Sequence, residues 1–207
     1  MIIDHFFIVV DPGAPQADLL LQLGLLEGPS NQHPGQGTAN RRFFFANTML
    51  EFLYVRDVNE ATTGRAKGLR TAERVIGESA SPFGLVLTAT EDPFPGWAYC
   101  PEYFRDDQCF LVGTNSDLLV EPLCICMPRN LPKPKKQHQP RNSDWCLSKL
   151  KISVPVESPS EVLQAVSECE NVEIVLSQSH HLELTFSENK EGKVHNMAPA
   201  LPLTLRW

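Results

Sequence analysis

Two ionisable side chains interrupt apolar strands early in the chain. His5 lies in residues 1–10 among Ile, Phe and Val, and Glu51 lies in the apolar run MLEFLYV. A carboxylate in an apolar strand is costly to bury without a partner, and an imidazole changes charge near neutral pH. One interpretation is a satisfied internal cluster, in which the two side chains pair with each other or with backbone groups. The other is a functional site, whose reaction these two residues do not specify.

Glu51 and the residues opposite it are expected to belong to one β-hairpin. The stretch 40–55, NRRFFFANTMLEFLYV, has two apolar runs separated by Asn-Thr, which is typical of a β-hairpin. With an even-numbered loop, Asn40, Arg42 and Phe44 share the face of Glu51. Arg42 either forms a salt bridge with Glu51 or binds a substrate carboxylate or phosphate as a bidentate clamp. Asn40 and Phe44 are expected to contact the same substrate.

An ordered loop is expected to border this site. Residues 91–105, EDPFPGWAYCPEYFR, combine three prolines with several aromatic residues. Ordered loops of this length are more often functional than passive, and Trp97, Tyr99 and Tyr103 could stack on a planar or apolar ligand. His33, in the glycine-rich segment HPGQGT, is instead expected to be a surface loop histidine and not a ligand. The glycines of this segment could let backbone N–H groups approach an anion, but no helix start follows, so the segment is not a phosphate loop.

The elements that position these residues follow a repeated order. The pattern predicts a strand over 1–10, a helix over 15–23 ended by Gly24, a weak strand over 25–31 and then the hairpin. Phe43 and Phe45 should face that helix, away from Glu51. A polar excursion with a short helix near 69–76 precedes strands over 83–90, 109–113 and 122–127. A second β-α-β-β-β order then follows, with strands over 147–154, 172–176, 181–186 and 201–207 and a helix over 160–167, capped by Ser158 or Ser160.

Composition excludes some classes of partner. The net charge of −7 argues against a nucleic-acid surface, and no apolar run approaches the ~20 residues that span a bilayer. No export signal is expected, because Asp4 and His5 interrupt the first apolar run. A cytoplasmic location is therefore expected, with all six cysteines as free, buried thiols.

These elements predict an α+β fold: two βαβββ modules with inserted strands, forming a curled mixed β-sheet with helices on the convex side. The first module covers residues 1–56, and residues 57–127 supply an inserted loop and strands that extend the sheet. Residues 128–145, rich in proline and lysine, are expected to be a linker. Residues 146–207 form a second, degenerate module.

The doubled module, the pair Asp4-His5 and the run HPGQGTANRRFFFANTMLEFLYV resemble the glyoxalase-like branch of the vicinal oxygen chelate superfamily. That superfamily includes glyoxalases, extradiol dioxygenases, epimerases and bleomycin-resistance proteins. The resemblance is strongest over residues 1–56, thinner over 83–127 and weak after 146. It implies paired modules curled around a divalent metal ion, with ligands on the first and fourth strands. His5 and Glu51 match those positions, whereas the second module has Leu150 in place of a histidine and Glu183 on its third strand.

The resemblance implies a metal-dependent lyase, isomerase or dioxygenase that acts on a small oxygenated molecule. Glu51 would be both a metal ligand and a catalytic proton relay. The alternative is a non-catalytic protein that sequesters a small molecule in the same cup. A third interpretation makes the degenerate module a scaffold for a homodimer.

Overall fold

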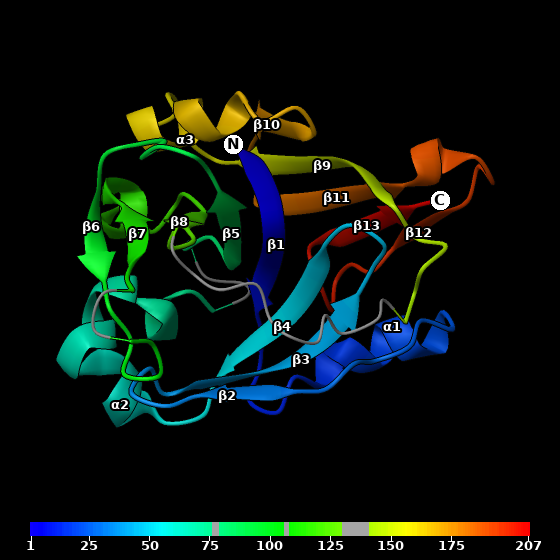
Figure 1. Cartoon of the computed structure of the whole chain (residues 1–207). Helices are drawn as coiled ribbons and strands as arrows, with labels where there is room; N and C mark the ends of the chain where they lie inside the picture. The colour runs from blue at the N-terminus through cyan, green and yellow to red at the C-terminus, as the bar shows by residue number, and fades with distance from the viewer. Residues whose placement is uncertain (76–78, 106–107, 130–140) are drawn as a thin grey trace.

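The computed structural model describes residues 1–75, 79–105, 108–129 and 141–207 (Figure 1). Most of the predicted linker 128–145 therefore lies outside the described residues, as does the end of the short helix predicted near 69–76. Among the described residues, no helix is long and apolar enough to cross a membrane.

The first predicted module is confirmed in its element order. Its elements are β1 (Ile2–Val9), the 3-10 helix η1 (Pro15–Ala17), α1 (Asp18–Gln22), β2 (Asn31–His33), β3 (Thr38–Phe44) and β4 (Met49–Val55). Gly24 follows the helix at φ +85°, a left-handed conformation that suits glycine at a helix end. The strand predicted over 25–31 is wrong, because Leu25 packs into the core and the backbone N–H of Leu26 bonds the side chain of Asn142. Strand β2 begins only at Asn31.

A curled mixed sheet of eight strands organises the first 127 residues (Figure 1). After the short helices α2 (Val58–Thr62), η2 (Gly64–Leu69) and η3 (Thr71–Glu73), the chain adds β5 (Phe83–Thr88), β6 (Gly96–Tyr99), β7 (Phe110–Gly113), the 3-10 helix η4 (Thr114–Asp117) and β8 (Leu123–Cys126). The strand order is β2-β3-β4-β1-β5-β8-β7-β6. The predicted α+β class and curled mixed sheet are confirmed.

The strand order corrects the expected position of the second module. β1 pairs with β4 in parallel and β5 pairs with β8 in parallel, while β1 and β5 run antiparallel at the centre. The order first-fourth-third-second thus recurs in β5–β8, within residues 83–127, and not in residues 146–207. The element pattern did not indicate this repeat, because β6, β7 and β8 are only four residues long and no α-helix follows β5 directly.

The C-terminal residues form a separate five-stranded sheet. Its elements are β9 (Leu147–Val154), α3 (Glu161–Ser167), β10 (Val172–Leu176), β11 (His181–Phe186), η5 (Ser187–Asn189), β12 (Val194–Asn196) and β13 (Leu203–Arg206), in the strand order β10-β9-β11-β13-β12. Ser160 caps α3, as one of the two predicted caps, by accepting the backbone N–H of Leu163. The β-α-β-β order is thus confirmed, but this sheet does not continue the first one.

Strand alternation divides the large sheet into two faces. Phe6 and Ile8 of β1 belong to a core shared with the five-stranded sheet, together with residues of α1 and α3. Phe43 and Phe45 are buried in that core with Leu20, as predicted. Phe7 and Val9 point to the opposite, concave face, where η2 contributes Ala66 and Leu69. His5 shares the face of Phe7 on β1, and Glu51 lies opposite Phe7 on β4, so both ionisable side chains lie on the concave face.

Candidate functional site

A β-bulge at the start of β1 brings two ionisable residues to the concave face. The pairing with β5 shifts between Ile3, opposite Leu87, and His5, opposite Val86, which leaves Asp4 as the extra residue. Bulges re-aim side chains near functional sites. Here Asp4 and His5 line the same cavity although they are adjacent in sequence.

His5 is held between two carboxylates. Its Nδ1 lies 2.6 Å from Oδ1 of Asp4, and its Nε2 lies 4.0 Å from Oε1 of Glu51. The predicted convergence of His5 and Glu51 is therefore confirmed as geometry. Burial by itself lowers the pKa of His5, but the hydrogen bond to Asp4 and the charge of Glu51 outweigh it and raise that pKa overall.

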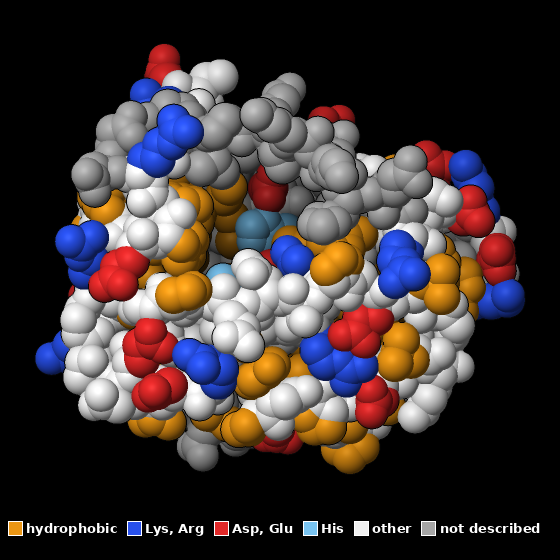
Figure 2. Space-filling model, turned by 60° about the horizontal axis from the view of Figure 1, so that its bottom comes forward, with side chains coloured by type: hydrophobic (Ala, Val, Ile, Leu, Met, Phe, Trp, Pro, Cys, Tyr) orange, Lys and Arg blue, Asp and Glu red, His pale blue; other side chains and the backbone are white. Residues whose placement is uncertain are grey.

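These residues lie in a cavity of about 280 Å³ on the concave face. Phe7, from β1, packs over Gly84 of β5, where a Cβ atom would lie 1.9 Å from the Phe7 ring. Figure 2 shows histidine side chains inside a recess of this face, with acidic and basic side chains close by. Apolar and aromatic residues make up most of the remaining lining: Phe7, Met49, Leu53, Leu69, Val86, Tyr99, Tyr103, Phe104, Phe110, Leu123, Ile125 and Met127.

Arg42 lines this cavity from β3, directly opposite Glu51 in the β3–β4 register. Its Nε donates to the carbonyl of Pro29 at 2.6 Å, and its guanidinium lies 5.2 Å from the centroid of the Phe44 ring. Burial lowers the pKa of Arg42 and the charge of Glu51 partly restores it. Arg42 therefore supplies positive charge to the cavity from a fixed position.

Three residues expected to contact a substrate lie outside the cavity lining. Phe44 packs under Arg42 and beside Gly28, whose added Cβ would lie 2.4 Å from the Phe44 ring. Asn40 is buried, and its Oδ1 accepts the backbone N–H of Asn31 at 2.8 Å. These two side chains support the strands that carry Arg42 and Glu51.

Trp97 also departs from its expected role. Its indole packs against Gly68 of η2, and its Nε1 donates to Oγ of Ser116 at 3.2 Å. The loop predicted over 91–105 contains strand β6, in which Trp97 and Tyr99 share one face with their ring centroids 6.3 Å apart, but only Tyr99 of this pair lines the cavity. Tyr99 and Tyr103 do line the cavity, as expected.

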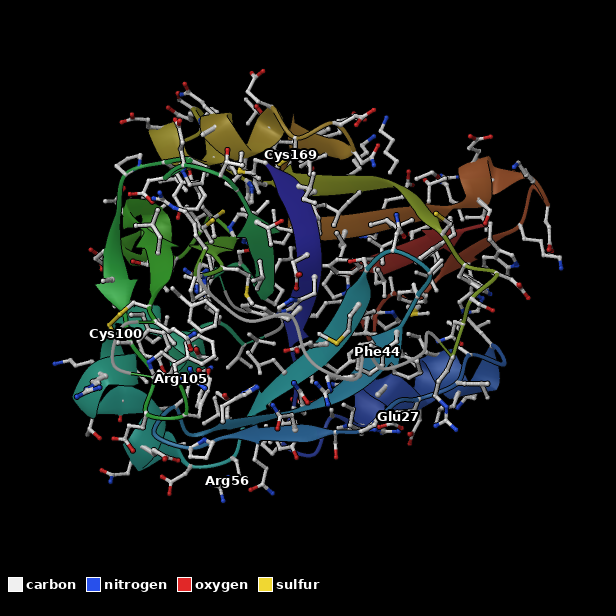
Figure 3. All side chains as sticks on the ribbon, in the orientation of Figure 1. Glu27, Phe44, Arg56, Cys100, Arg105 and Cys169 are labelled. Atoms are coloured by element: carbon white, nitrogen blue, oxygen red, sulfur yellow. A yellow bond between two sulfur atoms is a disulfide. The ribbon has the colours of Figure 1, made fainter. Side chains whose placement is uncertain are left out.

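A disulfide closes the β6–β7 hairpin, which carries the aromatic wall of the cavity, formed by Tyr99, Tyr103, Phe104 and Phe110. Strands β6 and β7 pair as far as Tyr99 opposite Phe110, and the next two residues, Cys100 and Cys109, are joined (Figure 3). The expectation of six free, buried thiols is therefore wrong for this pair, because strand pairing brings together two cysteines that the sequence pattern does not relate. It is also wrong for Cys146, which is free but exposed, whereas Cys124, Cys126 and Cys169 are free and buried.

His33 is a cavity residue that the sequence pattern did not indicate. It ends β2 opposite Thr38 of β3, and its Nδ1 lies 2.9 Å from Oγ1 of Thr38. Burial lowers its pKa, against the opposing charge of Glu51. Gln36, from the same glycine-rich segment, accepts the hydroxyls of Tyr99 and Tyr103 at 3.3 Å each and so joins this segment to the aromatic wall. The available sequence signal was the glycine-rich turn HPGQGT, because such a turn forms a hairpin that pairs His33 with Thr38, at the start of the strand that carries Arg42.

A larger depression, of about 720 Å³, lies between the start of β5 and the C-terminal sheet. Its histidines are already engaged: Nε2 of His180 lies 3.1 Å from the carbonyl of Ser79, and Nε2 of His181 lies 2.9 Å from Oγ1 of Thr204. None of the described residues that line it is an aspartate or a glutamate, in contrast to the concave cavity. The concave cavity is therefore the better candidate site.

The fold and the site define an α+β protein with a cupped mixed sheet and an ionisable cluster inside the cup. No family model matches the chain, and no curated protein matches it. A structure described as the crystal structure of a hypothetical protein from Staphylococcus aureus is similar over 99% of this chain and 97% of that chain. Its TM-score is 0.55 and its sequence identity is 10%, so the likeness shows the fold alone.

Proposed function

We propose that this chain is a glyoxalase-like lyase or isomerase that transfers protons on a small oxygenated molecule bound in the concave cavity. The observation that carries this proposal is the placement of His5 between Asp4 and Glu51 at a cavity otherwise lined by apolar and aromatic residues. The doubled first-fourth-third-second strand order and the positions of His5 and Glu51 on its first and fourth strands support the glyoxalase-like assignment.

His5 has the arrangement of a general base. With its Nδ1–H donated to Asp4, the lone pair of Nε2 is turned toward Glu51 and the cavity. An imidazolium formed by proton abstraction is stabilised by both carboxylates, in the way that a buried acid stabilises the histidine of a catalytic dyad. Glu51 can then accept that proton or return it to another atom of the substrate.

A resident divalent metal ion is only partly supported by the donor set. The 4.0 Å between Nε2 of His5 and Oε1 of Glu51 is somewhat longer than the roughly 3.4 Å that separates two ligand atoms of one tetrahedral ion, so a small movement would allow both to bind it. Within the described residues, however, no group of three or more His, Cys, Asp or Glu side chains could hold an ion. Catalytic zinc sites have three protein ligands, so the described donor set falls short of such a site.

The second candidate function is sequestration of a small molecule without turnover. Arg42 and the aromatic side chains of Tyr99, Tyr103 and Phe104 favour it, because they can bind an anionic aromatic compound without any proton transfer. This candidate shares the cavity but makes no use of His5 as a base.

The test compares turnover and binding in the chelated and the metal-supplemented protein. A panel of small hydroxy-carbonyl and dicarbonyl compounds is incubated with the parent, with His5→Ala and with His195→Ala, an exposed histidine on β12. Turnover that His5→Ala abolishes and His195→Ala preserves supports the enzyme. Binding without turnover in every sample supports sequestration. Turnover that appears only with Zn²⁺, Ni²⁺, Mn²⁺ or Fe²⁺ supports a metal-dependent enzyme instead.

A further inference from the structure

The cavity holds a second histidine whose two ring nitrogens have different surroundings. Nδ1 of His33 faces Oγ1 of Thr38, a side chain that is fully buried between β2 and β4. Nε2 is the ring nitrogen left for a ligand. His33 lines the same cavity as His5, Glu51 and Arg42.

The contacts of Thr38 favour one tautomer of His33. Oγ1 of Thr38 also accepts the side-chain amide of Gln36 at 3.0 Å. The amide is oriented by its other end, because Oε1 accepts the phenol protons of Tyr99 and Tyr103. Oγ1 of Thr38 is buried, and among the described contacts Nδ1 of His33 is the acceptor within reach of its single proton, because the Gln36 contact is itself a donor. The proton of the neutral His33 ring is then on Nε2.

The two histidines of the cavity therefore have opposite tautomers. Asp4 holds the proton of His5 on Nδ1 and leaves a lone pair on Nε2, whereas Thr38 leaves an N–H on Nε2 of His33. Burial lowers the pKa of His33, so this ring is neutral at pH 7. One ring can accept a proton while the other donates a hydrogen bond.

We propose that His33 is a catalytic hydrogen-bond donor, and that the substrate is a small α-hydroxy carbonyl compound. This inference rests on the proposed function. His5 removes the proton from the carbon that bears the hydroxyl, and the electrons of that C–H bond form a C=C bond. The carbonyl π electrons move to oxygen, and the resulting oxyanion accepts the Nε2–H of His33. His5 then returns the proton to the former carbonyl carbon, while the hydroxyl proton passes by way of Glu51 to the former carbonyl oxygen. The hydroxyl-bearing carbon becomes the new carbonyl, so the isomerisation needs no oxidant or reductant.

Arg42 adds charge to the same step. Its guanidinium lines the cavity opposite Glu51 and is held by Pro29 and the Phe44 ring, so it stabilises an anion without moving. The apolar and aromatic lining keeps the dielectric low around the donors, which strengthens their interaction with a developing oxyanion.

The first test measures the tautomers directly by long-range ¹H–¹⁵N correlation spectra of the full chain at pH 7. We expect His33 to be neutral with its proton on Nε2, and His5 to carry its proton on Nδ1 when neutral. The variant Thr38→Val keeps the shape of the side chain but removes the hydroxyl, and it should shift the His33 signals alone. A His33 ring that is protonated at pH 7, or that carries its proton on Nδ1, overturns the inference.

The second test follows deuterium incorporation into 2-hydroxyacetophenone in D₂O by ¹H NMR. We expect the parent to accelerate exchange at the hydroxyl-bearing carbon, and His33→Ala to lower the rate by about 10²-fold, as for loss of one oxyanion donor. His195→Ala is the matched control and should exchange like the parent. Equal rates in the parent and His33→Ala overturn the inference, while the proposed function stands if His5→Ala is inactive. A parent that does not accelerate exchange contradicts both the substrate class and the proposed function, whatever the tautomer of His33.

Discussion

Nε2 of His5 lies 4.0 Å from Oε1 of Glu51, across two adjacent parallel strands. The β1–β4 register pairs Phe7 with Glu51, and His5 precedes Phe7 on the same face of β1. Each strand supplies one of the two ionisable groups, and neither strand alone forms the contact. The contact exists because β4 returns next to β1 in parallel, after the chain has made the helix and two further strands.

The first prediction concerns the charge of His5. Its pKa is raised in the folded protein, so protonated His5 stabilises the fold below its unfolded pKa, and this stability is lost as the pH rises through the folded pKa. The variant Asp4→Asn removes the largest of the effects that raise this pKa, so it should lower the pKa of His5 and destabilise the protein more at pH 5 than at pH 9.

Histidine titration by NMR and urea unfolding at the two pH values check this. Asp144→Asn, at an exposed aspartate, is the control and should leave the pKa of His5 unchanged. A loss of stability in Asp4→Asn that is equal at both pH values would show that Asp4 acts by packing or backbone geometry alone.

The second prediction concerns the core beneath the site. Phe43 is fully buried, with its ring 5.8 Å from that of Phe52 in an edge-on arrangement. Phe43→Ala should lower the free energy of unfolding by about 3–5 kcal/mol, as for other buried aromatic residues. Val58→Ala, at a side chain that is 63% exposed, should change it little. Urea denaturation measures both, and a Phe43→Ala protein as stable as the parent would contradict the assigned faces of β3.

How far the sequence predicts this site depends on whether one strand or two determine the feature. Alternation within a single strand correctly predicts the faces of Phe43 and Glu51, because period-2 geometry is local. Asp4 enters the site through a bulge that exists only against β5, and His33 enters through its contact with Thr38. Such features need the register of a partner strand, which the sequence pattern does not specify.

The same reasoning explains the misplaced second module and the missed disulfide. Residues 146–207 repeat the order of elements, whereas residues 83–127 repeat the order of strands in the sheet. Only hydrogen-bonded pairing distinguishes these two kinds of repeat. Likewise, Cys100 and Cys109 become neighbours only because β6 and β7 pair up to Tyr99 and Phe110.

The third prediction concerns anion binding by Arg42. Benzoate should bind the Arg42→Ala variant more weakly than the parent, with a loss of binding free energy of about 2 kcal/mol, the scale of a hydrogen bond to a charged group. Benzamide, which is neutral and of similar shape, should lose much less. Isothermal titration calorimetry measures both affinities, with Arg42→Lys as the variant that keeps the charge but not the planar guanidinium. If Arg42→Ala lowers stability and leaves benzoate affinity unchanged, Arg42 is a structural partner of Glu51.

The fourth prediction concerns the disulfide at the base of the aromatic wall. Replacing Cys100 and Cys109 by serine should lower the free energy of unfolding by about 2–3 kcal/mol, because the bond closes a short loop. Cys146→Ser, at an exposed free cysteine, should have little effect. The denatured parent, prepared without reductant, should react with a thiol reagent at four cysteines. Reaction at all six would show that the bond is absent and would favour the reducing, cytoplasmic location expected from the sequence.

The central claim is that His5 is the base of a proton-transfer enzyme, and the pH dependence of deuterium exchange tests it most directly. The rate of exchange into 2-hydroxyacetophenone at low substrate concentration should rise with pH through a single ionisation. That kinetic pKa should equal the pKa of the His5 imidazole measured by NMR in the same buffer, and Asp4→Asn should lower both together. A kinetic pKa that does not move with that of His5, or a His5→Ala variant that exchanges as fast as the parent, would contradict the claim.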